Sequence, residues 1–207
     1  VALPPHTPRA VDAQIADLVL LAQSGTASVA QTGTRHASVD PSRGVFDVTA
    51  TGESWDADTA RAYELGALGT AAQLIGAGQA MLDTAVDYAK QRTQFGRVIG
   101  GYQAIKHKLA DVYAKNQLAR AHAYYGAWAL DTNAAEPPVA AAVARIAAND
   151  AGWLATKENV QTHGGMGFTW EMDCHLFYRR AKLMAVQLGS NPHWKDRLVH
   201  LWNAQAA

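Results

Sequence analysis

A long periodic pattern of apolar residues, typical of α-helices, constrains the fold of this 207-residue chain more than any other feature. From Leu65 to Ala89, mostly apolar or small residues recur alternately three and four positions apart, which is the spacing of one helix face. The same spacing returns from Ile105 to Leu130. Pro137 and Pro138 open a third stretch, where the first helical positions tolerate proline. The sequence therefore predicts three long helices.

Shorter helical segments follow the three long ones. One covers about Asp173 to Leu188, and a last one runs through Leu198 and Leu201, with Ser190 or Asn191 as its cap. Asp56 or Asp58 is the expected cap of the first long helix. The connections, including the loop "DTNAAEPP", are short, so neighbouring long helices should run antiparallel in an up-down bundle.

Residues 1–55 differ from the helical part. "IADLVLLAQSG" holds a short apolar run, and "GVFDVTATGES" alternates apolar with small or polar residues until Gly52. Both are typical of short strands, with "SVDPSRG" as the turn between them. We therefore predict a mainly α fold: a partial β-domain over 1–55, followed by a C-terminal up-down four-helix bundle over 56–207.

Composition excludes several classes of partner. Lys plus Arg equals Asp plus Glu at 18 each, which argues against nucleic acid or an anionic membrane as the main partner. No apolar run approaches the ~18 residues of a membrane span. Cys174 is the one cysteine, so no internal disulfide forms, which suits a cytoplasmic location.

Metal binding and nucleophilic catalysis have little support. His163, His175 and His193 share no four-residue spacing and lie near no cysteine pair, so we predict no metal site. Cys174 stands between Asp173 and His175, but we interpret it as a small apolar residue on a helix face.

The junction between the first two long helices is one candidate binding site. In "YAKQRTQFGRVIGGYQAIKHKLAD", Arg92 lies near the end of one helix, Gln103 near the start of the next, and Phe95 between them. A polar turn with Gly96 as C-cap explains this pattern without function. The same residues also suit a ligand with phosphate and a ring, because arginine binds phosphate with a forked donor and helix-start amides add to it.

The other candidate is "VQTHGGMGFTWE", at the end of the third long helix. Gln161 offers an amide side chain, while Gly164 and Gly165 leave the backbone bare. Bare backbone lets a phosphate or a ribose approach closely. Together the two segments predict a nucleotide site.

These two segments resemble the acyl-CoA dehydrogenase family, over about Ala60 to Ala185. "SVDPSRGVFDV" is more weakly similar to the last strands of the family's middle β-domain. The resemblance implies an N-terminal helical domain, a β-barrel domain and a C-terminal four-helix bundle. This chain would hold the end of the β-domain and the bundle.

The resemblance also implies a reaction. The family oxidises the Cα–Cβ bond of an acyl-CoA with FAD: a carboxylate takes the α-proton, the flavin takes the β-hydride, and an electron-transfer flavoprotein serves as acceptor. Bundle residues contact the FAD of a neighbouring subunit. The matching positions here are Arg92, Gln94 and Phe95 at the pyrophosphate and adenosine, with Gln103 nearby, and Gln161, Gly164 and Gly165 at the adenosine–pyrophosphate part.

The chain departs from the family at the base. After "YRRAK" the family continues to a Tyr-Glu-Gly-Thr segment whose Glu is the base, and Leu188 occupies that position here. Some members carry the base on the first bundle helix, where Gly66 aligns. Glu64 is near in sequence, but two residues are about 200° of helical rotation, so it should point elsewhere. We expect no catalytic residue in this chain.

Two interpretations follow. "QTHGGMGFTWE…HLFYRR" is similar to unequal-subunit dehydrogenases that act on CoA thioesters of steroid side chains. The chain would then be the base-lacking, FAD-contacting subunit beside a second dehydrogenase-like subunit. Alternatively, it is a non-catalytic scaffold or binding homologue, or a fragment of a longer dehydrogenase.

Overall fold

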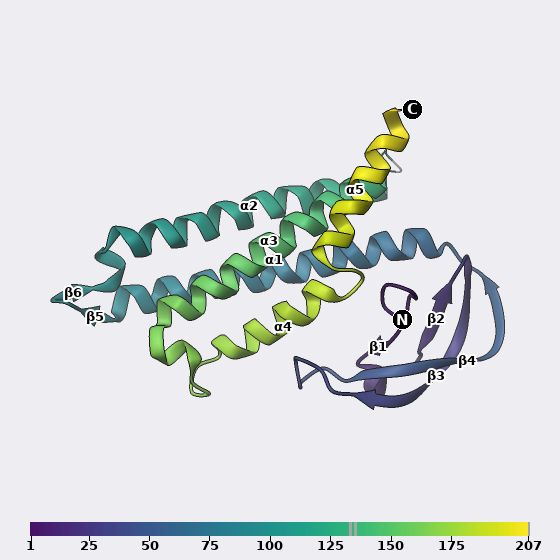
Figure 1. Cartoon of the computed structure of the whole chain (residues 1–207), viewed down its shortest axis with the longest axis horizontal. Coiled ribbons are helices and arrows are strands. Elements are labelled where there is room, and N and C mark those ends of the chain that lie inside the picture. The colour runs from purple at the N-terminus through teal and green to yellow at the C-terminus, as the bar shows by residue number, and fades with distance from the viewer. Residues whose placement is uncertain (133, 135, 207) are drawn as a thin grey trace.

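The computed structural model of the protein describes residues 1–132, 134 and 136–206 (Figure 1). Its α-helices are α1 Thr59–Gln91, α2 Gln103–Asp131, α3 Pro137–His163, α4 Cys174–Val186 and α5 Asn191–Ala206. Short 3-10 helices are η1 Ala13–Ile15, η2 Ile99–Gly101 and η3 Gly164–Phe168. The three long and two short helices confirm the predicted mainly α fold. Asn133 and Ala135, in the predicted loop "DTNAAEPP", lie outside the described residues.

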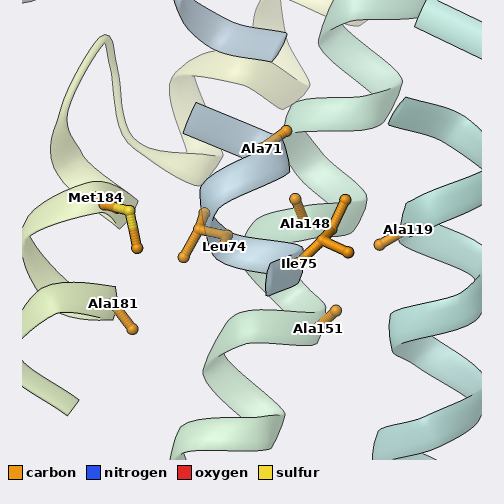
Figure 2. Packing of buried hydrophobic residues seen from close by; sticks show 8 residues of the cluster. All are labelled: Ala71, Leu74, Ile75, Ala119, Ala148, Ala151, Ala181 and Met184. Carbon is orange, nitrogen blue, oxygen red and sulfur yellow. The ribbon is translucent and has the colours of Figure 1, made fainter. Parts of the chain in front are cut away.

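The helices form the predicted bundle. α1, α2 and α3 run alongside one another, and α4 packs against α1 and α3 (Figure 1). Figure 2 shows one core cluster in which Leu74, Ile75 and Met184 fill the space between alanines from α1, α2, α3 and α4. Alanine lets helix backbones approach closely, so this core is held by many short contacts rather than by large side chains.

The sequence pattern predicted the position of α1 correctly, but it predicted only part of the helix face that is buried. The Asp58 side chain accepts a hydrogen bond from the Arg61 backbone at 2.9 Å, so Asp58, of the two expected residues, is the cap. Leu68 and Ile75 are buried as expected, but Leu65 is 51% exposed. A stripe with a period of 3.5 drifts around a helix of 3.6 residues per turn, and packing on several sides moves the buried face.

A four-stranded antiparallel sheet precedes the bundle. Its strands are β1 Ala10–Val11, β2 Leu20–Gln23, β3 Thr26–His36 and β4 Val45–Asp56, in the order β1-β4-β3-β2. The polar strand β3 was not predicted, because its alternation is weak. Gly52 does not end β4: it lies opposite a register shift between Ser28 and Ala30, so it sits in a bulge and the strand continues.

The sheet is attached to the bundle by polar contacts. Arg180 of α4 donates to Asp40 at 2.5 Å and to Ser42 at 3.1 Å, both in the loop between β3 and β4. The Leu188 amide donates to Thr7 Oγ1 at 2.8 Å. Within residues 1–132, 134 and 136–206, no helix combines the length and the apolar character needed to cross a membrane.

Candidate functional site

Both predicted binding segments lie at one end of the bundle, where α1 and α3 end and α2 begins (Figure 1). The ring of Tyr88, in the last turn of α1, stacks on His163, the last residue of α3, with centroids 4.3 Å apart. His163 Nδ1 in turn donates to the Asn159 carbonyl at 2.8 Å. We call residues 92–103 and 161–168 together the hairpin end.

The hairpin end contains a short β-hairpin that the sequence pattern did not predict. Strands β5 Thr93–Gln94 and β6 Arg97–Val98 pair across a two-residue turn. Phe95 and Gly96 in that turn have φ of 51° and 81°, as a type I′ turn requires. Gly96 is therefore not a helix C-cap: the cap of α1 is Arg92, which is already extended.

Phe95 is held in an unfavourable backbone conformation. A bulky residue at positive φ is an outlier that persists only when its surroundings hold it there. The Tyr102 hydroxyl is placed to donate to the carbonyls of Gln94 and Phe95, at 3.1 and 3.2 Å. Arg97 lies over the Tyr102 ring, 4.0 Å from its centroid. Phe95 is 93% exposed. Sequence reasoning missed Tyr102, because only the hairpin reveals its role.

The predicted polar residues of the hairpin end face outward. Arg92, Gln94, Gln103 and Gln161 are all exposed. Gln94 Nε2 donates to the Thr93 carbonyl at 2.7 Å, whereas no hydrogen bond or ion pair of the Arg92 side chain is found in the described part of the chain. No side chain caps the first turn of α2. Guanidinium, amides and helix-start N–H groups at one end of a bundle can bind phosphate oxygens.

The structure explains two of the three glycines in "GGMG". Gly164 has φ 60° and ψ −137°, a conformation that favours glycine. At Gly167 a methyl group would lie 2.5 Å from the Val160 carbonyl oxygen, so close packing excludes a side chain. At Gly165 neither applies, since its φ is not positive and a methyl group would meet no atom within 4 Å. Nothing within the described chain requires glycine at 165.

The two positions that the family resemblance assigns to the base meet in space. A methyl group on Gly66 of α1 would lie 2.8 Å from Leu188 Cδ1, in the turn between α4 and α5. Leu188 is 5% exposed and belongs to a buried cluster that includes Tyr63 and Trp194. Gly66 and Leu188 are far apart in sequence but adjacent in the structure, and neither has a polar side chain. We call residues 187–190 the base-position turn.

Side chains from several elements fix the base-position turn. Leu188 has φ 59°. Its carbonyl accepts from the Tyr63 hydroxyl of α1 at 2.6 Å and from Trp194 Nε1 of α5 at 3.0 Å, and its amide donates to Thr7 near the N-terminus. With the Tyr63 proton on that carbonyl, His193 Nε2 is left to donate to the Tyr63 oxygen at 2.9 Å. Burial raises the pKa of Tyr63 to about 12, so the hydroxyl stays protonated.

A buried arginine holds the other side of this turn. Arg145 of α3 is fully buried and donates to the Met184 carbonyl, to the Gln187 carbonyl at 2.8 Å and to Asn149 Oδ1 at 2.9 Å. Burial lowers the pKa of Arg145 to about 10, which still leaves it charged near neutral pH. A cation is favourable at this helix C-terminus. Sequence reasoning missed Arg145, since no motif distinguishes it.

The Glu64 carboxylate is paired with α5 rather than with the base-position turn in the described residues. Its carboxylate, in a residue 6% exposed, accepts from Arg197 of α5 at 3.3 Å. Burial raises the pKa of Glu64, and the Arg197 charge opposes that rise. Cys174 is buried, and burial raises the pKa of its thiol, which makes it a poor nucleophile. No cluster of three potential metal ligands occurs among the described residues.

Comparisons with known proteins agree on one family. The family described as "Acyl-CoA dehydrogenase, C-terminal domain" matches residues 56–195. Acyl-CoA dehydrogenase IpdE2 of Mycobacterium tuberculosis (strain ATCC 25618 / H37Rv) is 38% identical over 182 residues, which cover 87% of this chain and 55% of that protein. The chain therefore spans about half the length of this curated relative.

Solved structures share the fold. The ChsE4-ChsE5 complex from Mycobacterium tuberculosis superposes with a TM-score of 0.79 at 24% identity, covering 92% of this chain and 56% of that one. The Tcur3481-Tcur3483 steroid ACAD gives a TM-score of 0.82 at 21% identity, covering 99% and 62%. At these identities the likeness is one of fold.

Proposed function

The chain belongs to the acyl-CoA dehydrogenase family, and we propose that it is an FAD-contacting subunit that lacks the catalytic carboxylate. The observation that carries this proposal is the contact between Gly66 and Leu188. α,β-Desaturation of an acyl-CoA needs a base at the α-carbon, and neither residue accepts a proton. The nearby carboxylate, Glu64, is paired with Arg197 instead. A second, dehydrogenase-like subunit would supply the base.

The hairpin end fits a dinucleotide held by a neighbouring subunit. FAD, when bound, supplies the hydride acceptor. Arg92 and Gln94 would bind its pyrophosphate, Phe95 would pack on the adenosine side, and Gln103 would lie nearby. Gln161, Gly164 and Gly165 would leave room for the adenosine–pyrophosphate part. The exposed Phe95 ring and the bare Gly165 support this assignment, because the described chain itself gives neither residue a contact that explains it.

The distance between the two regions supports sharing of the cofactor. Gly66 and the end of α1 at Gln91 are separated by about 37 Å at 1.5 Å per helical residue. A single FAD is too short to contact both the hairpin end and the base-position turn. The hairpin end would thus contact the FAD of one active centre, while the base-position turn lies near another.

The substrate and partners follow from the relatives. We propose CoA thioesters of steroid side chains, since one similar structure is described as a steroid ACAD and another as a complex of two differently named chains. An electron-transfer flavoprotein would receive the electrons, as it does in the family, and the reaction would take place in the cytoplasm. The neutral charge balance is compatible with these small-molecule and protein partners.

The visible flavin spectrum tests this proposal. The chain is purified alone and after co-expression with a dehydrogenase-like chain that carries the carboxylate, encoded by a neighbouring gene. We expect a colourless lone chain and a yellow complex. A yellow lone chain would contradict the shared site. Absence of flavin from both would favour the alternative that the chain is a scaffold or a binding homologue.

Arg92→Ala in the complex tests the cofactor contact. A charge-assisted hydrogen bond to phosphate contributes about 1.5–3 kcal/mol, so we expect FAD affinity to fall at least tenfold. The ratio of flavin to protein after gel filtration and a thermal melt of the complex measure this. Arg35→Ala removes an exposed arginine from β3 and is the matched control. Equal flavin content in both variants would argue against the assignment.

A further inference from the structure

A small cavity of about 270 Å³ lies where α3, α4 and the start of α5 meet. Leu74, Ala181 and Ala185 form its apolar part, and Figure 2 shows the first two side by side in the core. Polar and aromatic residues of α3, α4 and α5 form the rest. One water molecule takes about 30 Å³ in the liquid, so the cavity has room for a small organic molecule. Its lining residues belong to neither the hairpin end nor the base-position turn.

Asn149 of α3 brings a buried hydrogen-bond donor to this cavity. The residue is 5% exposed, and its Oδ1 accepts from Arg145 Nη1 at 2.9 Å. Because arginine can only donate, this bond fixes which way the amide is turned and leaves Nδ2 as the free end. Nδ2 is buried and has no partner within the described residues. A buried donor without an acceptor is costly, so an acceptor in the cavity would be stabilised here.

Asn191, the first residue of α5, brings a buried acceptor in the same way. Its Nδ2 donates to Asp150 Oδ1 at 2.7 Å. Because an ionised carboxylate can only accept, this bond leaves Oδ1 as the free end of the amide. Oδ1 is buried and lacks a partner among residues 1–132, 134 and 136–206. The cavity thus has one unsatisfied donor on α3 and one unsatisfied acceptor on α5.

Charged side chains of both signs accompany these amides. Arg145, next to Asn149, is fully buried and bonds to carbonyl groups and that amide, but to no carboxylate of the described chain. Lys182 of α4 lies over the Trp153 ring of α3, with Nζ 3.5 Å from its centroid. A buried cation without an anion is unfavourable, so these two residues favour an anionic group. Asp150, at the opposite wall, favours a cationic group.

We propose that this cavity binds a free α-amino acid with an apolar side chain. Its carboxylate would accept from Asn149 Nδ2 and lie near Lys182. Its ammonium group would donate to Asp150 and to Asn191 Oδ1, and its side chain would pack against Leu74. A ligand that is only an acid would meet the carboxylate of Asp150, and one that is only an amine would meet Lys182, so the site favours a molecule with both groups.

The bound amino acid would connect the two helices that flank the base-position turn. Lys182 precedes the turn in α4, and Asn191 follows it at the start of α5. Asn149 reaches the same turn through Arg145, which donates to the Gln187 carbonyl at 2.8 Å. A ligand that binds only this folded arrangement stabilises it. The amino acid would therefore stabilise the turn without touching the cofactor.

Isothermal titration calorimetry of the purified full chain with L-leucine tests the site. We expect one L-leucine per chain. Isocaproate, which lacks the amino group, and isoamylamine, which lacks the carboxylate, should each bind at least tenfold more weakly, because each loses the bonds to one charged wall. L-leucine should also raise the melting temperature of the chain more than either analogue. Isocaproate or isoamylamine binding as tightly as L-leucine would overturn the proposal.

Two variants test whether binding occurs in this cavity. Lys182→Met keeps the side-chain stem and removes the charge, and Asp150→Asn does the same at the opposite wall. Each should weaken L-leucine binding at least tenfold, with unchanged circular dichroism. Lys115→Met and Asp111→Asn, at exposed positions of α2, are the matched controls and should bind like the wild type.

Two further outcomes would overturn the proposal. A wild-type chain that binds no L-leucine would mean that water alone fills the cavity. Equal binding by all four variants would place the amino acid elsewhere. Neither outcome bears on flavin retention, which depends on the hairpin end and has its own spectrum-based test.

Discussion

The base-position turn and the hairpin end contrast in how their strained residues are held. At the turn, Leu188 is buried and its backbone bonds to side chains from α1, α5 and the N-terminal segment. At the hairpin end, Phe95 has a similar positive φ, but within the described residues its carbonyl accepts a side-chain hydrogen bond from Tyr102 alone, and Phe95 is almost fully exposed. One region is complete within the described chain, whereas the other presents groups outward. The difference agrees with our proposal that a cofactor of a neighbouring subunit contacts the hairpin end.

The largest expected effect tests how far the turn depends on its buried support. Trp194 is fully buried, stacks on Tyr63 at 4.9 Å and donates to Leu188. Trp194→Ala should lower the free energy of unfolding by about 3–5 kcal/mol, because it leaves a cavity and removes one of the two hydrogen bonds to the Leu188 carbonyl. Urea denaturation measures this. Trp202→Ala, on the exposed side of α5, should change it by less than about 0.5 kcal/mol. Equal losses of unfolding free energy in the two variants would show that the base-position turn does not depend on Trp194.

A smaller effect is expected where Gly66 meets Leu188. Gly66→Ala should destabilise the fold by about 1 kcal/mol, since its methyl group would lie 2.8 Å from the leucine. In a Leu188→Ala background the same change should stabilise by up to about 1 kcal/mol, because alanine favours helix over glycine. At Gly69 an added methyl group would meet no atom within 4 Å, so Gly69→Ala should stabilise the fold both with Leu188 and with Leu188→Ala. Urea denaturation of the wild type, the two single variants and the double variant measures whether the two changes in unfolding free energy add. If they simply add, the contact between Gly66 and Leu188 is disproved.

The stability of the turn should depend on pH through two histidines. The rings of His6 and His193 lie 4.2 Å apart, and burial, with the Arg197 charge, lowers the pKa of both. The unfolded chain therefore binds protons more readily than the folded chain. The stability contributed by the two neutral histidines is fully present above pH 6.5, and it is lost as the pH falls through their lowered pKa values. Unfolding free energy should decrease from pH 7.5 to 5.0, and less so in His6→Gln/His193→Gln. Glu64, whose pKa is raised, acts in the opposite direction but equally in both proteins.

The smallest expected stability effect belongs to the hairpin end. Gly165→Ala should leave the unfolding free energy of the lone chain within about 0.5 kcal/mol, because the methyl group meets nothing. In the co-expressed complex the same change should reduce bound flavin, if a dinucleotide approaches the bare backbone. Gly167→Ala, where the packing is closed, should instead destabilise the lone chain. Full flavin content in the Gly165→Ala complex would show that the open space serves no cofactor.

Periodicity predicted the helices because each buries an apolar face, and Asp58 and Pro137 mark the starts of α1 and α3. It failed where long-range contacts decide the structure. β3 is polar and becomes a strand only between β2 and β4, and the hairpin at Phe95 needs Tyr102, which lies beyond the turn. The meeting of Gly66 and Leu188 cannot be read from spacing, since the family resemblance names both positions but not their contact. Arg145 and Trp194 carry no local signal either.

The contact between Gly66 and Leu188 has an evolutionary consequence. If these are the two places where relatives carry a base, a carboxylate can move between α1 and the turn without a change of fold. In this chain the leucine side chain occupies the room above Gly66, so a glutamate arising at 66 would collide with it. A carboxylate at position 66 would therefore need Leu188 to change first. Under the proposed function, loss of the base would be hard to reverse once the leucine is in place, and dependence on a partner would be inherited with it.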